Sequence, residues 1–353
     1  YQHNYNIVYT PHIGRANLWQ TSGHLDFYKE NMYAPMVLDE QEYYLKPMNC
    51  PFHIMIYRSS LHSYRELPLR IGELGTVYRY ERSGVMHGLM RVRGFTQDDA
   101  HIFCMPNQVE SEIGGVLDLT FEILQAFGFS EYQISLSTRP EKYVGDLDMW
   151  EHATASLKNA LDERNLSHDI DDGGGAFYGP KIDIKIKDAL GREWQCTTVQ
   201  FDFNLPERFD LTFQDSEGNR TRPYMVHRAI FGSLERFFGV LIEHYAGAFP
   251  LWLTPIQAVV IPIADRHHEY AQSVQTQLRE QGFRVDVDDR GERMNLKIRN
   301  AQMQKIPYML VVGDREQEQA AVSVRQREEG DLGSMALADL AARMKGEVVQ
   351  RHS

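Results

Sequence analysis

Hydrophobic positions in the C-terminal part of the chain follow two alternating patterns. QAVVIPI (257–263) and YMLVVG (308–313) are continuous apolar runs, which are typical of parallel strands buried on both faces. EYAQSVQTQLREQG (269–282) and NLKIRNAQMQKI (295–306) have apolar residues at helical spacing, and FRVDVDD (283–289) alternates like a strand. The order strand, helix, strand, helix, strand predicts a compact α/β domain with a mostly parallel sheet.

Strand-like segments in the first 250 residues come in neighbouring pairs instead. The first pair is VYRYER (77–82) and RGFTQDDAHIF (93–103), and the second is KIDIKI (181–186) and EWQCTTVQFDF (193–203). A helical pattern at 107–128 lies between the two pairs. Because neighbouring strands joined by short loops pair antiparallel, this part is predicted to be α+β, with an antiparallel sheet and flanking helices.

The change of pattern marks a domain boundary. An apolar helical pattern begins at Ile230, and Gly247 and Pro250 end it. We therefore expect one domain over residues 1–250 and a second over residues 251–353.

One predicted strand carries an unusual row of polar side chains. Every second residue of RVRGFTQDDAHIF (91–103) falls on one face, namely Arg91, Arg93, Phe95, Gln97, Asp99, His101 and Phe103. In a hairpin with the preceding strand, Arg79 and Glu81 would join that face. Such a face is either solvated or the floor of a site. Arginine suits phosphate oxygens and phenylalanine suits a stacked base, so two neighbouring strands of this kind favour a site for a nucleotide polyphosphate.

Composition narrows the class of protein. The chain has 353 residues, 42% hydrophobic and 24% charged, which is typical of a globular protein with two or more domains. No apolar run approaches the roughly 18 residues that span a bilayer, and no signal peptide opens the chain. Three cysteines are an odd and sparse set, which argues against a disulfide scaffold and for a reducing compartment, so we expect a cytoplasmic protein. The net charge of −12 argues against nonspecific coating of nucleic acid, but a local basic patch could still bind a structured RNA.

Several motifs together resemble one enzyme family. R-x-E, a variable loop and RVRGFTQDDAHIF are similar to motif 2 of class II aminoacyl-tRNA synthetases, and HRAIFGSLERFFGVL (227–241) resembles motif 3. Four further segments resemble the threonyl-tRNA synthetases in particular, namely LKPMNCPFHI (45–54), STRPEKYVG (137–145), GGGAFYGPKIDI (173–184) and WQCTTVQFDF (194–203). The resemblance implies a class II antiparallel sheet followed by an α/β anticodon-binding domain. It also implies activation of L-threonine with ATP and Mg²⁺, then transfer to tRNA(Thr).

The resemblance assigns residues to the ATP site. Arg79 corresponds to the arginine on the α-phosphate, where preorganised positive charge lowers the barrier. The other implied ATP contacts are Arg91 at the far phosphates, Phe95 and Arg236 on the two faces of adenine, Glu81 at the adenine amino group, and Gln195 at the reacting phosphate.

A zinc site is implied by the resemblance alone. Cys50, His101 and His227 correspond to the family's ligands, although their spacing matches no metal motif. Without the resemblance, Cys50 beside Pro51 is most simply a buried thiol and His101 a satisfied strand histidine. Three protein ligands leave positions open, which is the catalytic pattern. The amino and hydroxyl groups of threonine would fill those positions, and an apolar pocket alone would reject nearly isosteric valine by only about 100-fold. Around the threonine the family places Asp99, Gln97, Tyr178 and Lys181.

Further positions correspond to tRNA contacts. His24 matches a catalytic histidine near the tRNA 3′ end, although a lone histidine is more often structural. Lys297, Arg299, Glu316 and Arg325 are implied anticodon contacts, and the competing interpretation of the first two is a solvated helix face. GGGAFYGP is followed by no Gly-Lys-Ser/Thr, so a P-loop is disfavoured, and we interpret the three consecutive glycines (173–175) as allowing close backbone approach or loop closure.

The sequence begins at Tyr1, so we expect that an N-terminal part is missing. In bacterial members of the family that part contains the editing region and the long motif 1 helix, which builds the homodimer. The chain alone is therefore expected to dimerise weakly and to charge tRNA with serine without correcting the error.

Two other functions compete with threonine activation. A noncatalytic nucleic-acid-binding paralogue, or an inactive fragment, would be expected to lose the motif 2 and 3 arginines or the zinc ligands. A sister enzyme for proline or serine would lack this zinc triad. All of these residues are present, so threonine activation is the favoured prediction.

Overall fold

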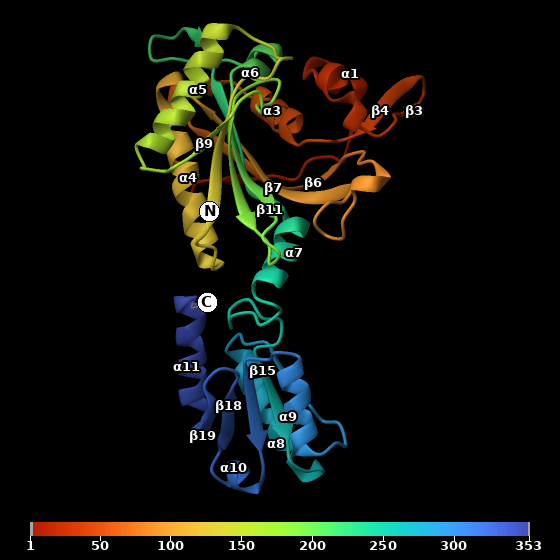
Figure 1. Cartoon of the computed structure of the whole chain (residues 1–353), viewed down its shortest axis with the longest axis vertical. Coiled ribbons are helices and arrows are strands. Elements are labelled where there is room, and N and C mark those ends of the chain that lie inside the picture. The colour runs from red at the N-terminus through yellow and green to blue at the C-terminus, as the bar shows by residue number, and fades with distance from the viewer. Residues whose placement is uncertain (1–2, 352–353) are drawn as a thin grey trace. The chain divides into compact units, whose positions relative to one another are not determined.

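The structure, a computed structural model, describes residues 3–351. Its contacts divide the chain into two compact units, Tyr1–Leu241 and Ile242–Ser353 (Figure 1). The division falls inside helix α7 (Leu234–His244), ahead of the change of sequence pattern at residue 250. Within the described residues, no helix combines the length and the apolar character needed to cross a membrane.

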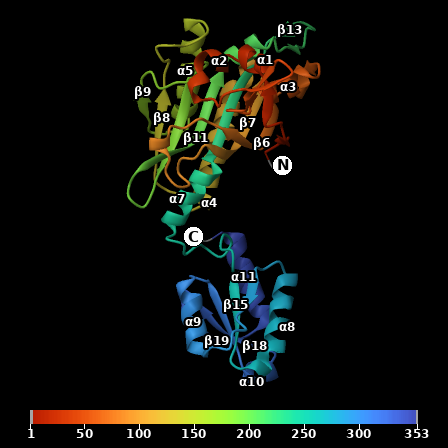
Figure 2. The same cartoon turned by 90° about the vertical axis from the view of Figure 1, so that its right-hand side faces the viewer.

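An eight-stranded sheet forms the centre of the first unit (Figures 1 and 2). Its order is β1-β6-β7-β14-β11-β10-β8-β9, and all neighbours are antiparallel except β1 with β6 and β8 with β9. The strands are β1 (Asn6–Ile7), β6 (Leu69–Tyr78), β7 (Gly94–Cys104), β8 (Tyr132–Ser137), β9 (Asp169–Asp171), β10 (Lys181–Lys187), β11 (Glu193–Asp202) and β14 (Tyr224–Ser233). The predicted α+β class with an antiparallel sheet is therefore confirmed.

Helices cover both faces of this sheet, because successive side chains of each strand point to opposite sides. α4 (Val109–Ala126) and α5 (Leu147–Asp162) pack together on one face (Figure 1). α3 (Cys50–Arg58) lies on the other face, where the ring of Tyr57 stacks on Phe103 of β7 with centroids 4.5 Å apart. The alternate residues of β7 that were predicted to share a face thus point toward α3.

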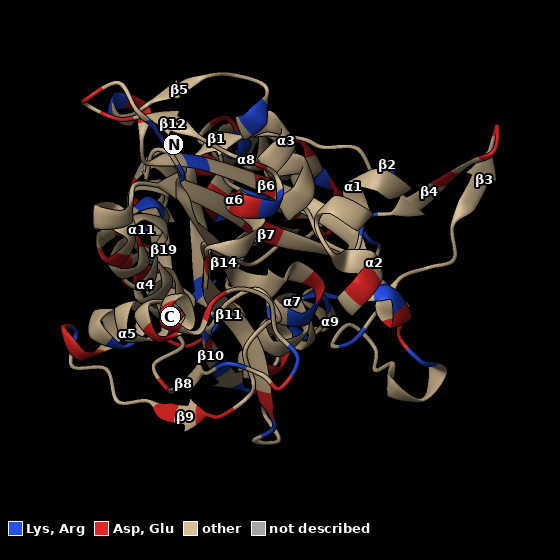
Figure 3. Cartoon of the chain, turned by 90° about the horizontal axis from the view of Figure 1, so that it is seen from above, with Lys and Arg blue, Asp and Glu red and all other residues tan. Residues whose placement is uncertain are grey.

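Shorter elements surround the sheet. The helices α1 (Ala16–Thr21), α2 (His24–Phe27) and α6 (Asn204–Arg208) accompany two three-stranded sheets, β2 (Ile13–Arg15) with β4 (Gln41–Leu45) and β3 (Met36–Leu38), and β13 (Arg220–Thr221) with β12 (Phe213–Gln214) and β5 (His62–Ser63). Acidic residues lie at the tip of the β3–β4 hairpin and along β9 (Figure 3).

The polar hairpin differs from its prediction at both strand ends. β6 ends at Tyr78 and β7 begins at Gly94, so Arg79, Glu81 and Arg91 lie on the connecting loop and not on the strands. Loop residues are not held to strict alternation, and these three side chains are positioned by individual contacts.

The segment that begins at Ile230 was predicted to be helical and is a strand as far as Ser233. The pairing of β14 with β7 shifts register between Ala229 and Ser233. In this bulge the backbone N–H groups of residues 230–232 donate hydrogen bonds to the carboxylate of Asp98. These N–H groups are therefore satisfied without the hydrogen bonds of a helix.

The second unit is a five-stranded sheet in the order β16-β15-β17-β18-β19. β15 (Ala258–Pro262), β16 (Val285–Val287) and β17 (Tyr308–Val312) are parallel, as predicted, but β18 (Ala321–Gln326) and β19 (Gly330–Ala336) add a hairpin that pairs antiparallel. The sheet is therefore mixed and not mostly parallel. The helices are α8 (His268–Glu280), α9 (Met294–Met303), α10 (Asp314–Glu318) and α11 (Leu337–Gln350).

The glycine-rich loop before β10 makes close backbone contacts. A Cβ at Gly175 would lie 2.4 Å from the carbonyl oxygen of Thr138, and one at Gly179 would lie 1.9 Å from that of Phe201. Real Cβ atoms do not approach so near, so any other residue would push the loop away from the sheet. The close approach predicted for the three consecutive glycines is thus observed at Gly175, and Gly179 is a further close contact that was not predicted.

We expect Gly179→Ala to lower the free energy of unfolding by about 2–3 kcal/mol, because backbone on both sides must move. The matched control is Gly115→Ala on α4, where a Cβ meets open space and alanine should stabilise the helix by about 0.5–1 kcal/mol. Urea denaturation of both variants measures the difference. Equal stability of the two variants would show that the loop adapts without strain.

Candidate active site

A cavity of about 770 Å³ opens on the α3 face of the large sheet. Phe95, Gln97, Asp99 and His101, the alternate residues of β7, line it in sequence order. Other residues singled out from the sequence also line it, namely Cys50, Arg79, Glu81, Arg91, Tyr178, Lys181, Gln195, His227 and Arg236. Residues from five separated parts of the chain thus meet in one cavity.

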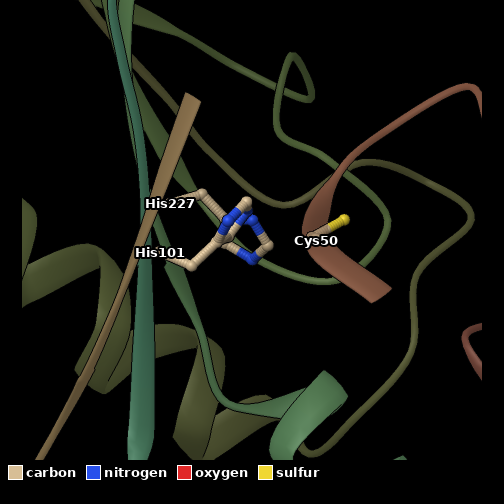
Figure 4. A group of neighbouring side chains, drawn as sticks. All are labelled: Cys50, His101 and His227. Atoms are coloured by element: carbon tan, nitrogen blue, oxygen red, sulfur yellow. The ribbon is translucent and has the colours of Figure 1, made fainter. Parts of the chain in front are cut away.

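A cysteine and two histidines meet near the C-terminal end of β7. Cys50 begins α3, while His101 and His227 are directly paired across β7 and β14. Each of the three offers a ligand atom, and these atoms lie within 4.8 Å of one another. Figure 4 shows the two imidazoles projecting from neighbouring strands toward the helix that carries Cys50. All three residues are buried.

Partner residues leave one nitrogen of each imidazole available. His227 Nε2 lies 2.8 Å from Asp202 Oδ2, and His101 Nδ1 lies 2.7 Å from His53 Nδ1. Burial lowers the pKa of His101 well below its usual range and raises that of the Cys50 thiol well above it. Neutral imidazole and a sulfur ligand held close together form the donor set that zinc prefers, so the residues fit this metal.

Cationic and aromatic side chains line the outer part of the cavity. The Arg79 guanidinium lies 5.1 Å from the ring centroid of Phe95 and 6.0 Å from that of Tyr28. Arg79 Nε donates to the carbonyl oxygen of Pro47, and Arg91 Nε donates to Glu81 at 3.1 Å. Contacts with aromatic rings therefore help to hold Arg79 in place, and an ion pair holds Arg91 beside Glu81.

Arg236, at the start of α7, is held by backbone carbonyls. Its guanidinium donates to Met90 O at 2.8 Å and to Gln195 O at 3.0 Å, and it lies 5.6 Å from the ring of Trp194. Burial lowers the pKa of Arg236. Phe95 therefore has the cationic Arg79 beside it, and Arg236 has the aromatic Trp194 beside it. Phe95 and Arg236 are the two residues that the family resemblance assigned to the two faces of adenine.

Comparison with known proteins supplies a family. Residues 33–245 match the model for the tRNA synthetase class II core domain (G, H, P, S and T), and residues 257–347 match the anticodon binding domain. A structure of the RNA binding domain of threonyl-tRNA synthetase from Cryptosporidium parvum superposes with a TM-score of 0.93 at 42% identity, covering 97% of this chain and 86% of that one. The chain belongs to the threonyl-tRNA synthetase family.

Curated relatives agree with this assignment. A threonine–tRNA ligase from Sulfurihydrogenibium sp. is 59% identical over 99% of this chain, and one from Nitrosococcus oceani is 61% identical over 94% of it. The chain covers 54% and 52% of these two proteins, so it spans about half the length of the curated relatives that it matches. A prolyl-tRNA synthetase structure from Cryptosporidium parvum shares the fold with a TM-score of 0.71, at 17% identity over 99% of this chain and 66% of that one.

The threonyl-tRNA synthetase motifs also bring in a carboxylate that sequence reasoning missed. Asp183 on β10 accepts from Lys181 Nζ at 2.5 Å, from Gln195 Nε2 at 2.6 Å and from Thr198 Oγ1 at 2.8 Å. It therefore fixes two of the predicted site residues at once. The alternation of KIDIKI places Lys181 and Asp183 on one face, so this signal was present in the sequence.

A second missed carboxylate, Asp98, lies on the opposite face of β7. Besides the N–H groups of the β14 bulge, its side chain accepts from Arg228 at 3.4 Å. Burial raises the pKa of Asp98 to about 6, although Arg228 and the backbone N–H groups act to lower it. No sequence signal marks this role, because the bulge it stabilises is a long-range pairing.

His24 lies behind the cavity and is not among its lining residues. Its ring is fully buried, with Nδ1 2.7 Å from Ser22 Oγ and Nε2 3.2 Å from Met48 Sδ, and Met48 does line the cavity. Burial, followed by the charge of Arg79, lowers the pKa of His24 to about 3.

The four predicted anticodon contacts differ in accessibility. Arg299 is exposed, Glu316 and Arg325 are half-buried, and the Glu316 carboxylate caps α10 by accepting from Gly313 N at 3.0 Å. Lys297 is only 3% exposed, and its amine donates to the carbonyl oxygens of Pro262 and Asp288. The alternative of a solvated helix face is therefore wrong for Lys297.

We expect Asp98→Asn to destabilise the chain by about 2–4 kcal/mol, because the amide loses the charge and turns its NH₂ group toward backbone donors. Asp118→Asn is the matched control, since the Asp118 side chain is 65% exposed and its ion pair with Arg164 is worth about 0–1 kcal/mol. Urea denaturation compares the two. A loss at Asp98 no larger than at Asp118 would mean that the bulge is held by other contacts.

Proposed function

We propose that the chain activates L-threonine with ATP and Mg²⁺ and transfers it to tRNA(Thr), with a catalytic domain at 1–250 and an anticodon-binding domain at 251–353. One observation carries the proposal. A Cys/His₂ cluster suited to zinc and a set of arginines suited to phosphate lie in a single cavity, joined by alternate residues of β7. A nucleotide and a small polar amino acid could therefore lie side by side on one strand, as formation of an adenylate requires.

At the ATP end, arginines bind and orient the phosphates. Arg79 meets the α-phosphate, where negative charge grows as the threonine carboxylate attacks, and Arg91 meets the far phosphates. Phe95 and Arg236 bound the adenine, Glu81 accepts from its amino group, and Gln195 faces the reacting phosphate. Their present partners are carbonyls, an aromatic ring and one exposed ion pair, and ATP would replace some of these contacts.

At the amino-acid end, Cys50, His101 and His227 would hold a zinc ion. When bound, the ion would supply open coordination positions that the amino and hydroxyl groups of threonine fill and that the methyl group of valine does not. Asp99 accepts the threonine hydroxyl proton, and Gln97, Tyr178 and Lys181 enclose the substrate. Asn49 Nδ2 donates to Asp99 Oδ2 at 3.0 Å, which orients that carboxylate.

The transfer step and tRNA binding rest on the remaining residues. We propose that His24 helps to move a proton from the ribose hydroxyl. Met48 has to move aside first, and the pKa of about 3 makes the buried ring a weak base, so His24 also has to lose some of its burial before it can accept the proton. Lys297, Arg299, Glu316 and Arg325 are the proposed anticodon contacts, and Lys297 would act there only after leaving its carbonyl partners. We further propose a homodimer when the complete catalytic domain is present, working in the cytoplasm.

Amino-acid-dependent exchange of pyrophosphate into ATP tests the proposal with the 353-residue chain. We expect exchange with threonine, weaker exchange with serine, and at least 100-fold less with valine or proline, since only hydroxyl amino acids suit the open metal positions. Removal of zinc with a chelator should abolish exchange, and added zinc should restore it. Threonine exchange that persists after full metal removal would contradict the proposed role of the cluster.

A further inference from the structure

A line of buried polar side chains runs from the Cys/His₂ cluster into the interior. His53 on α3 lies between His101 and Glu73 of β6, with Nδ1 2.7 Å from His101 Nδ1 and Nε2 3.1 Å from Glu73 Oε2. Exposure of the three residues is 0% for His53, 1% for His101 and 3% for Glu73. Neither His53 nor Glu73 lines the cavity. Their polar atoms are therefore directed at the metal cluster and not at a substrate.

The far end of the line is a charged group held in place. Glu73 accepts from Thr10 N at 2.9 Å, from Thr10 Oγ1 at 2.8 Å and from Lys46 Nζ at 3.3 Å. Burial acts to raise the pKa of Glu73, but the hydrogen bonds from His53 and Thr10 and the charge of Lys46 outweigh it and bring the pKa to about 2. An ionised carboxylate only accepts hydrogen bonds, so the His53 nitrogen that faces it carries the proton.

The position of this proton on His53 determines which nitrogen of His101 is protonated. With its proton on Nε2, His53 presents a lone pair at Nδ1. The His101 nitrogen 2.7 Å away then donates, so the His101 proton lies on Nδ1 and its Nε2 is free to bind a metal. His101 Nε2 is also the nitrogen that lies 3.8 Å from Asp99, a residue that lines the cavity. The opposite tautomer of His53 would set the lone pair of its Nε2 against the Glu73 carboxylate, where no hydrogen bond can form.

We propose that His53 and Glu73 are positioning residues, which hold His101 in the tautomer and orientation that bind zinc and thereby set the zinc affinity of the chain. This inference rests on the proposed zinc site. Asp202 contacts the ring of His227 directly, whereas Glu73 acts on His101 through the ring of His53, which lies between them. Such partners of ligating histidines typically change metal affinity by about 10- to 100-fold.

Stability alone is a poor reason for this arrangement. A buried lysine, glutamate and histidine lose their hydration, and well-packed apolar residues of similar volume are often at least as stable. The network also joins β6, α3 and the Thr10 segment, so a purely structural role is the competing explanation. Zinc affinity separates the two explanations, because a structural role affects unfolding without selectively affecting the metal.

The experiment measures zinc affinity by competition with a chromophoric chelator. His53→Leu removes the acceptor for His101, and we expect zinc affinity to fall by about 10- to 100-fold. His53→Asn keeps an oxygen close to the position of Nδ1, so this variant should retain most of the affinity. Glu73→Gln should weaken zinc binding because its amide no longer fixes the His53 tautomer.

The matched control is Glu112→Gln. Glu112 on α4 is also a buried carboxylate of the same unit, and it accepts two 2.7 Å hydrogen bonds from Arg70 on the α4 face of the sheet, opposite the cavity. Its loss should lower stability and leave zinc affinity unchanged. Equal weakening by Glu112→Gln and Glu73→Gln, or wild-type zinc affinity in a folded His53→Leu chain, would overturn the inference.

A second measurement does not depend on the folding of any variant. Long-range ¹H–¹⁵N NMR spectra of the zinc-loaded wild-type chain report which nitrogen of each imidazole is protonated. We expect His101 protonated at Nδ1 and His53 at Nε2, and the opposite pattern at either ring would be incompatible with the inference. A wild-type chain that binds no zinc would instead refute the proposed metal site itself.

Discussion

The direct pairing of His101 with His227 across β7 and β14 is the constraint on which the rest of the site depends. The side-chain period of a strand is two, so a slip of one residue would turn every cavity-lining residue of β7 toward α4. The same register that joins the histidines therefore also fixes the row that ends at Phe95. Cys50 completes the cluster because it is the first residue of α3, and this end of the helix lies next to His101 and His227.

Buried carboxylates maintain this geometry from both faces of the sheet. Asp202 and Glu73 act on the histidines, the second of them through His53, while Asp183 fixes Lys181 and Gln195. On the opposite face, Asp98 closes the bulge that lets β14 end and α7 begin at the right place for Arg236. Each of these charges is satisfied by several donors, as burial requires. The polar interior is thus part of how the cavity keeps its shape.

Sequence patterns predicted the regular elements better than the connections. Both strand pairs of the first unit and the helix over 109–126 were anticipated because their periodicity is local. The strand at Ile230 was taken for helix, because Ile230 and Phe231 directly before a helix fit the apolar spacing of either state and only the distant Asp98 distinguishes the two. The β18–β19 hairpin was missed because β18 is only six residues long and β19 (GDLGSMA) carries little hydrophobic alternation.

The sequence by itself determined the class of fold, the polar face of β7 and, through its motifs, the family and the candidate site residues. Alternation and motif spacing are properties of the chain that survive without coordinates. The meeting of Cys50, His101 and His227 was implied by the family resemblance and by no pattern of the residues themselves, and the tertiary structure brings the three together. Only the tertiary structure decided that His24 is covered, that Lys297 is buried, and that His53 and Glu73 lie behind the cluster. These facts depend on strand register and helix packing between segments far apart in the chain, and no local pattern encodes a contact of that kind.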